Sequence, residues 1–320
     1  MLQNGFFCLC CLPSSVAWPM LVQKLFDGPL DVVGDVHGEF QALKALIAAL
    51  GYSEDGTHKD GRRLVFVGDL TDRGPDSPGV VRFVDQLLEA GLAQCVLGNH
   101  DLNILSDLRK YDNGWFFGEK FVFEEHEIPQ QLADDDVREQ VLRLFRKLPV
   151  ALERDDLRIV HAYWDQPSVD SIRGESDAVA LFEVHKARIK AYNQTNADWD
   201  QHDRDLNQQH MNPVRLLTSG PEQRVRTPFV ASGKTRYLDR VKWWEDEDAA
   251  GPLTIFGHYS LPYEYPRVGS AICCDYAVAR RWRERIRPDF VEPYSGRLGA
   301  IRVPEMTVVF DDGSEERLAV

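Results

Sequence analysis

Three short polar motifs, each directly after an apolar run, constrain this chain more than any other feature. The motifs are Gly34-Asp35-Val36-His37-Gly38, Gly68-Asp69-Leu70-Thr71-Asp72-Arg73-Gly74 and Gly98-Asn99-His100-Asp101. The preceding runs read as buried strands, and they are Leu30 to Val33, Leu64 to Val67 and Cys95 to Leu97. Amphipathic helical patterns follow the first two motifs. We therefore expect all three motifs at the carboxyl edge of an open α/β sheet, where such sheets bind their ligands.

Two later histidines repeat the arrangement of a strand followed by a polar side chain. His161 ends the run Leu157 to Val160, and His258 follows Thr254-Ile255-Phe256-Gly257. Oxygen and nitrogen side chains of this kind suit an ion such as Mn, Fe, Zn or Co. Glycines beside them allow the sharp turns that point a short side chain out of the sheet end. A single histidine of this kind is more often a core or cap residue, so the prediction of one shared site depends on the whole set.

In this order the motifs resemble those of the calcineurin-like metallophosphoesterases. They are most similar to the phosphoprotein phosphatase branch, which includes bacterial diadenosine tetraphosphatases and bacterial serine/threonine phosphatases. The resemblance covers roughly residues 30–165 and 252–280. It implies an α/β fold, namely a four-layer α/β/β/α sandwich of two mixed sheets with a lid-like insertion. It also implies two divalent metal ions, Mn or Fe first and Zn, Co or Ni as alternatives.

The resemblance further implies a role for each motif residue. Asp69 would bridge the two ions, because a shared ligand is needed to hold two cations about 3.5 to 4 Å apart. The other implied metal ligands are Asp35 and His37 for the first ion and Asn99, His161 and His258 for the second. Asn99 would also contact substrate.

Three further residues have implied catalytic roles. His100 would protonate the leaving alkoxide, with Asp101 holding it and keeping it cationic. Arg73 would bind two phosphate oxygens with its forked guanidinium. Asp72 would orient the histidine or the arginine, or serve only as a turn residue, and the sequence leaves these alternatives open.

The chain departs from the family pattern at two places. The arginine that follows the Gly-Asn-His motif in eukaryotic protein phosphatases is missing from Asp101-Leu102-Asn103, and the possible replacements are Arg215, Arg224 and Arg236. Tyr163 stands where the family often has glycine, and together with the neighbouring Trp164 it would stack on a base or simply narrow the mouth of the site. Asp275 is a candidate supporting residue.

These features favour a hydrolase that uses a metal-bound hydroxide to remove phosphate from a phosphoprotein or a small phosphate ester. The alternative is a hydrolase of dinucleoside polyphosphates such as diadenosine tetraphosphate. A third possibility, an inactive binding protein, is disfavoured because every expected ligand is present. The expected partner is accordingly a phosphorylated substrate.

Charge and composition exclude other classes of partner. The net charge of −14 disfavours a nucleic acid polymer, and no apolar run approaches the roughly 18 residues of a membrane span. Six cysteines without a disulfide framework favour a reducing, cytoplasmic location. Cys8 and Cys11 have a C-x-x-C spacing, but no second pair supports a redox or metal role.

The chain is expected to form one metallophosphoesterase domain over residues 20–320, with an insertion at 165–250 that is a lid, a substrate-selecting element or mere decoration. Residues 1–19 are expected to be a non-native or disordered extension, with Met20 as the natural start. Other expected elements include helices at 102–111, 137–148 and 176–193, a polar segment without assigned structure at 196–212, and a hairpin from 297 to 311 that extends the second sheet.

Overall fold

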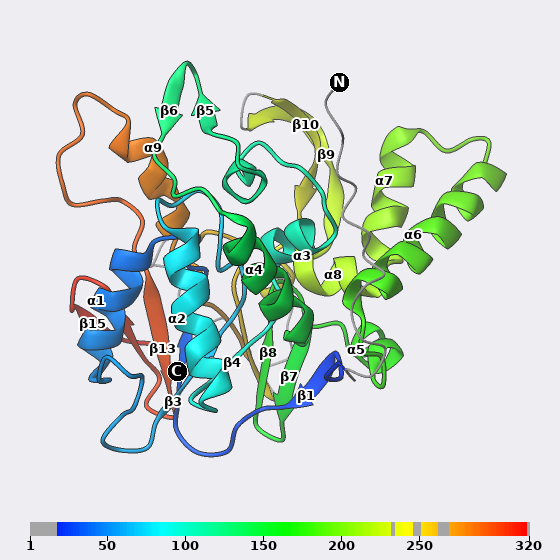
Figure 1. Cartoon of the computed structure of the whole chain (residues 1–320). Coiled ribbons are helices and arrows are strands. Elements are labelled where there is room, and N and C mark those ends of the chain that lie inside the picture. The colour runs from blue at the N-terminus through cyan, green and yellow to red at the C-terminus, as the bar shows by residue number, and fades with distance from the viewer. Residues whose placement is uncertain (1–17, 232–233, 246–250, 262–268, 319–320) are drawn as a thin grey trace.

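The computed structural model describes residues 18–231, 234–245, 251–261 and 269–318. Two mixed sheets pack face to face in this part of the chain, and helices cover the outer face of each (Figure 1). This is the four-layer arrangement that the sequence analysis expected. The expectations for residues 1–17, including Cys8 and Cys11, lie outside the described residues.

The larger sheet has six strands in the order β15-β14-β13-β2-β3-β4. Its parallel half carries the three motifs, and its strands are β2 (Leu30–Val33), β3 (Arg63–Phe66) and β4 (Ala93–Cys95). The antiparallel half consists of β13 (Gly299–Val303), β14 (Thr307–Phe310) and β15 (Glu315–Arg317). The expected C-terminal hairpin is therefore present. Its predicted sheet was wrong, because β13 pairs with β2 rather than with a strand of the smaller sheet.

The smaller sheet has five strands in the order β1-β7-β8-β11-β12. Their bounds are β1 (Val22–Lys24), β7 (Ala151–Arg154), β8 (Leu157–Val160), β11 (Leu253–Phe256) and β12 (Ala271–Cys273). Strands β8 and β11 run parallel as neighbours. His161 and His258 consequently emerge at the same sheet edge, although 97 positions separate them (258 − 161).

The helices follow from amphipathic patterns closed by recognisable caps. On the larger sheet lie α1 (Phe40–Leu50), α2 (Ser77–Glu89) and α4 (Asp135–Lys147), with the short α3 (Asn99–Leu105) after the third motif. Asp76 and Asp134 accept the first free backbone N–H groups of α2 and α4. Helix α3 begins and ends earlier than the expected range of 102–111, because it starts within the motif itself.

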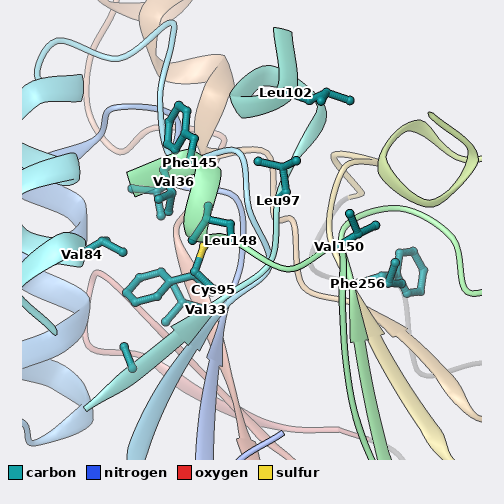
Figure 2. Close-up of a cluster of buried hydrophobic side chains, with 14 of the residues drawn as sticks. Val33, Val36, Val84, Cys95, Leu97, Leu102, Phe145, Leu148, Val150 and Phe256 are labelled. Carbon is teal, nitrogen blue, oxygen red and sulfur yellow. The ribbon is translucent and has the colours of Figure 1, made fainter. Parts of the chain in front are cut away.

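The core has two parts. Between the sheets lies a fully buried aliphatic layer that includes Val32, Val65, Leu152, Ile159 and Ile255. Burying a side chain of this size stabilises the fold by about 1.5 to 3 kcal/mol. A second cluster runs from Val84 on α2 through Cys95 and Leu97 to Phe256 on β11, and Figure 2 shows how it lies around the upper ends of the strands. The motif loops thus rest on a packed base.

The described part of the expected insertion contains more regular structure than its sequence suggested. It comprises α5 (Gln166–Ile172), α6 (Ala178–Thr195), α7 (Gln201–His210), α8 (Pro213–Ser219), the ribbon β9 (Glu222–Ala231) with β10 (Lys234–Arg240), and η3 (Trp243–Glu245). Helix α6 confirms the predicted helix at 176–193. Helix α7 occupies the polar stretch for which no structure was predicted, and a capping box of Asp200 and Asp203 starts it.

The remaining elements surround the motif end of the sheets. They are η2 (Gly114–Phe117), the hairpin β5 (Phe121–Phe123) with β6 (His126–Ile128), η4 (Val278–Arg280) and α9 (Arg281–Arg285). Of the helices in the described residues, none has both the length and the apolar character needed to cross a membrane.

Candidate metal centre

The motif residues converge on one buried cluster at the upper sheet edge. Asp69 Oδ2 lies 3.6 Å from His37 Nε2 and 3.4 Å from His161 Nε2. Asn99 Oδ1 lies 3.2 Å from His161 Nε2 and 2.7 Å from His258 Nδ1. Side chains from five separate segments are therefore in contact, as the sequence analysis expected.

Asp69 occupies the centre of this cluster. Asp69 belongs to two sets of three potential metal ligands. One set is His37, Asp69 and His100, and the other is Asp69, His161 and His258; within each set the ligand atoms lie within 4.8 Å of one another. Asp35 completes the first set, because its Oδ2 lies 3.8 Å from His37 Nε2. A carboxylate common to two neighbouring sets of donors is the arrangement that a bridging ligand requires.

The tautomers of two histidines explain why the cluster suits cations. His37 Nδ1–H donates to the Thr71 carbonyl at 3.0 Å, and His161 Nδ1–H donates to the Val67 carbonyl at 2.7 Å. Each Nε2 therefore faces carboxylate oxygens in a site that is almost closed to water. A cation bound there would replace the proton of His161 Nε2 as the partner of Asp69, and backbone acceptors of this kind commonly fix metal-binding histidines. The donor set of carboxylate, imidazole and amide oxygen fits divalent ions of the Mn, Fe and Zn class.

The electrostatics of the buried carboxylates agree with this fit. Burial, with the negative charge of Asp275, raises the pKa of Asp35 well above its ordinary value. Burial would also raise the pKa of Asp69, but His161 and His100 outweigh it and hold that pKa well below the usual range. Conversely, burial lowers the pKa of His161, yet Asp69 raises it to about 10. Asp69 is therefore a concentrated negative charge surrounded by nitrogen donors.

The backbone around these side chains is held in unusual conformations. His37, Asp69, Asp72, Arg73 and His258 all have positive φ, between 45° and 75°. Left-handed conformations cost non-glycine residues of order 1 to 3 kcal/mol each, and they are retained mainly where the surrounding structure enforces them for function. Their concentration at this edge marks it as a functional site.

Two glycines allow the carboxylates to approach. A Cβ atom on Gly98 would lie 2.2 Å from Asp69 Oδ1, and one on Gly257 would lie 2.0 Å from Asp35 Oδ1. Real Cβ atoms do not come so close, so both positions require glycine.

We expect Gly257→Ala to displace Asp35 and weaken metal binding at least tenfold while the fold survives, an effect of the size that misplaced supporting contacts have in metal sites. Metal titration of the purified variant measures this. Gly61→Ala is the control, because nothing lies within 4 Å of a Cβ at that position, and its φ of +68° adds a backbone strain that Gly257 does not have. Equal metal affinity of the two variants would contradict the steric argument.

The carboxylate that holds His100 is not the expected one. Asp72 Oδ2 lies 2.6 Å from His100 Nδ1, whereas the Asp101 carboxylate accepts backbone N–H groups from Leu70 and Gly98, both at 3.1 Å. The expectation that Asp101 orients His100 is therefore wrong. Asp101 points back from the first turn of α3 and fastens two motif loops together. Of the alternatives left open for Asp72, the structure selects orientation of the histidine.

The charge state of His100 follows from its carboxylate neighbours. Burial and the Arg73 guanidinium both lower the pKa of His100, but Asp69, Asp112 and Asp72 together raise it above its ordinary value. Because His100 Nε2 lies 2.9 Å from Arg73 Nη2, which can only donate, the ring would carry the proton that a leaving group needs once a phosphate binds the guanidinium in its place.

Arg73 lies against the cluster where the sequence analysis placed it. Its Nη1 is 3.2 Å from His37 Nε2 and its Nη2 is 2.9 Å from His100 Nε2. Asp112 fixes the guanidinium through Nε at 3.0 Å. The forked face of Arg73 is thereby directed at the space between the two histidines.

Sequence reasoning missed three contributors to the site, namely Asp112, Trp115 and Arg240. Arg240 on β10 donates from Nη1 to the His258 carbonyl at 2.8 Å, and its charge helps to lower the pKa of His258, after burial. Asp112 and Trp115 lie in a stretch rich in aromatic and acidic residues that has no clear periodicity. Such a composition indicates an unusual region of the chain, but it does not predict which side chains contact the site.

Within the described residues, none of the three suggested replacement arginines bonds to a metal-ligand residue. Arg215 donates to Gln209, and Arg224 pairs with the acidic residues of the α7 cap. Arg236 is exposed on β10. Arg240 is the arginine of this ribbon that contacts the metal-ligand loop.

The other sequence candidates have clear positions. Trp164 is 5% exposed and donates to Gln166, so it cannot stack on a substrate. Tyr163 packs edge-on against Trp243 with ring centroids 5.1 Å apart. Asp275 accepts from the backbone and hydroxyl of Ser260, which supports the loop that carries His258.

Comparison with known proteins agrees with this geometry. A family model described as calcineurin-like phosphoesterase matches residues 28–291. The chain is 32% identical over 146 residues to the asymmetrical bis(5'-nucleosyl)-tetraphosphatase PrpE of Oceanobacillus iheyensis, an overlap of 42% of this chain and 55% of that protein. It is 32% identical over 154 residues to the symmetrical bis(5'-nucleosyl)-tetraphosphatase of Pectobacterium carotovorum, an overlap of 46% and 49%. The chain thus spans about half the length of these relatives.

Solved structures resemble the whole described fold at low sequence identity. A cold-active protein-tyrosine phosphatase of a psychrophilic Shewanella species is 16% identical, with a TM-score of 0.52 and coverage of 93% of this chain and 82% of that chain. At this identity the likeness concerns the fold alone.

Proposed function

The chain belongs to the calcineurin-like phosphoesterase family, and on that premise we propose that it hydrolyses phosphoric esters with two divalent metal ions. The observation that carries the proposal is the central position of Asp69 between two sets of metal-ligand atoms. Asp35 and His37 would hold the first ion, Asn99, His161 and His258 the second, and Asp69 both. When bound, the ions would neutralise phosphate oxygens and make a water nucleophilic at neutral pH.

The other residues of the site would act on the substrate. Arg73 would bind two phosphate oxygens, since Asp112 holds its fork in place. As the bond from phosphorus to the leaving oxygen breaks, His100 would give its Nε2 proton to that oxygen, and Asp72 would stabilise the cationic ring before transfer. Arg240 would provide a second positive charge beside His258.

The described insertion contacts both strands that carry the second-ion histidines. Ala162, next to His161, donates its N–H to the Leu217 carbonyl and accepts from Trp243 Nε1, while Arg240 binds the carbonyl of His258. We propose on this basis that the described part of the insertion at 165–250 forms a substrate-selecting wall of a single domain. The free thiols of Cys95, Cys273 and Cys274 suit a reducing, cytoplasmic location.

The first substrate candidate is a phosphomonoester, on a phosphoprotein or a small molecule. The second is a dinucleoside polyphosphate, which the names of the relatives suggest. One structural feature favours the second. Tyr111 is 55% exposed, and the next residue, Asp112, binds Arg73. The Tyr111 ring also lies near enough to Arg73 for the two to interact electrostatically, so an exposed aromatic ring stands beside the arginine that would bind phosphate.

Positive charge accompanies this ring. Tyr111 packs against Phe121, Phe121 against Trp282, and the guanidinium of Arg283 lies 4.9 Å from the Trp282 ring. Arg236 lies near enough to Tyr111 to affect it electrostatically. Within the described residues neither Arg236 nor Arg283 forms an ion pair with a carboxylate. An exposed ring beside two such arginines suits a leaving group that carries a base and further phosphates.

We expect Tyr111→Ala to lower kcat/KM for diadenosine tetraphosphate about tenfold or more and to leave p-nitrophenyl phosphate hydrolysis unchanged, because stacking on a base contributes roughly 1 to 3 kcal/mol. Tyr192→Ala is a matched control, since Tyr192 is equally exposed at 56% but lies on α6. Equal losses on both substrates would contradict a role in base recognition.

The whole proposal is tested by measuring turnover of a phosphopeptide, p-nitrophenyl phosphate and diadenosine tetraphosphate by the Mn-loaded protein. Preference for the dinucleotide would select the second candidate, and preference for the phosphopeptide the first. A protein that binds two equivalents of Mn and hydrolyses none of the three would contradict both and leave the inactive binding protein.

A further inference from the structure

A buried tryptophan lies behind the pair formed by His100 and Asp72. Trp115 on η2 is completely buried, and its Nε1–H donates to Asp72 Oδ1 at 2.7 Å. The other oxygen of the same carboxylate, Oδ2, lies 2.6 Å from His100 Nδ1. Each oxygen of Asp72 thus has one side-chain partner, and the three side chains form a line from the core to the cluster.

We propose that Trp115 is a positioning residue for phosphoester cleavage, which acts by fixing the Asp72 carboxylate and through it the ring of His100. This inference rests on the proposed function. Trp115 would touch neither substrate nor metal.

The position of Asp72 explains why such a partner is needed. Asp72 is fully buried on a left-handed turn with φ of 75°, and the Ser77 hydroxyl accepts its backbone N–H at 3.0 Å. These contacts fix its backbone but do not set the rotation of the carboxylate about its last bond. Trp115 at Oδ1 and His100 at Oδ2 set that rotation together, so loss of the indole N–H would leave His100 alone to hold the carboxylate.

A buried carboxylate also tends to take up a proton, and burial raises the pKa of Asp72. The indole N–H opposes this tendency, because it stabilises the charged form of the oxygen that it meets.

Trp115 is itself anchored by its backbone. Its carbonyl accepts the N–H of Ala133 at 2.9 Å, and its ring packs edge-on against Phe116 with centroids 5.9 Å apart. The indole is therefore fixed relative to the second motif although 43 positions separate it from Asp72.

The expected consequence concerns proton transfer to the leaving group. When the bond from phosphorus to the leaving oxygen breaks, the electron pair stays on that oxygen and the His100 Nε2 proton neutralises it, while Asp72 remains ionised. A basic leaving group needs this proton, whereas an acidic phenol departs well without it. Poor positioning of His100 therefore costs most on esters of basic alcohols.

The experiment measures kcat and KM of Trp115→Phe over a series of aryl phosphates that runs from acidic to basic phenols. Phenylalanine keeps a buried aromatic ring and removes the N–H donor. We expect kcat on the most basic phenol to fall roughly 10- to 100-fold, the range typical of supporting hydrogen-bond partners in metal sites. We expect little change on p-nitrophenyl phosphate, an unchanged KM and unchanged bound metal.

Trp164→Phe is the matched control. Trp164 is also buried and also donates from its indole, to Gln166 at 3.1 Å, so its loss reports the general cost of removing such a donor. A uniform fall of kcat across the series in Trp115→Phe, or the same leaving-group dependence in Trp164→Phe, would overturn the proposal. Wild-type protein that hydrolyses none of the series would instead refute the proposed function.

A second measurement keeps the tryptophan in place and remains informative if Trp115→Phe fails to fold. In wild-type protein the indole N–H resonance of Trp115 should show strong protection from exchange with solvent. In Asp72→Asn it should shift, and kcat should show the same steeper leaving-group dependence. An indole resonance that is insensitive to Asp72→Asn would overturn the proposed hydrogen bond.

Discussion

Replacement of Asp69 with asparagine should abolish binding of both metal ions and lower kcat about a thousandfold or more. The amide keeps the shape of the side chain but removes the charge at the centre of the two ligand sets. A catalytic metal contributes several kcal/mol of transition-state stabilisation, and each 1.36 kcal/mol is about a factor of ten in rate. Metal analysis of the dialysed variant and single-substrate kinetics measure the two losses.

Asp85→Asn is the matched control for this prediction. Asp85 is another buried aspartate, 6% exposed, but it lies on α2 and accepts from Gln140. It should lose some stability and keep its metal and its turnover. Retention of two equivalents of metal by Asp69→Asn would show that this carboxylate does not join the two sites.

His100→Asn should lower kcat roughly 10² to 10⁴-fold, the usual contribution of a positioned general acid, while both ions remain bound. Asparagine can still meet Asp72 with its amide but has no proton to give. The loss should be largest for esters of basic alcohols, since these depend most on protonation. Stopped-flow or steady-state kinetics with parallel metal analysis test this.

A remote buried histidine provides the control for His100→Asn. The side chain of His58 is 4% exposed and packs against Tyr52 at the opposite end of the sheet from the motifs. His58→Asn should leave the rate unchanged. An unaltered rate in His100→Asn would remove this residue from the mechanism, and loss of metal would instead make it a ligand.

The centre of the fold could be predicted because its sequence signals are local. Buried strands such as β2 and β3 are mostly apolar, with Asp31 and Arg63 as the exceptions, and the polar motif that follows each of them lies at the sheet edge. Helices α2 and α4 have both an apolar stripe and a cap. The convergence of His161 and His258 could be predicted for the same reason, because each histidine follows a predicted strand closely.

The carboxylate that binds His100 could not be predicted, because it is determined by the directions in which the side chains point and not by their closeness in sequence. Asp101 is adjacent to His100, but neighbours on a helix point to different sides, and its carboxylate turns back to the backbone of Leu70. Asp72 reaches the histidine from another loop, through a left-handed turn. A contact between side chains of two different loops can be identified only from the three-dimensional structure.

The insertion was hard to predict for a different reason. Helix α7 is polar on nearly every face, since it contacts neighbouring helices and β9 rather than the main core, so it lacks the periodicity that identifies helices. The ribbon of β9 and β10 is likewise largely exposed. Its arginine Arg240 nevertheless reaches the loop of His258, which no local pattern indicated.

We propose that residues from five segments of the chain bind two cations that share Asp69. The direct measurement is the anomalous diffraction of Mn-loaded crystals of the full chain. We predict two anomalous peaks, with Asp69 contacting both, His37 contacting one and His161 and His258 contacting the other. A single peak, or two peaks of which Asp69 contacts at most one, would contradict the account.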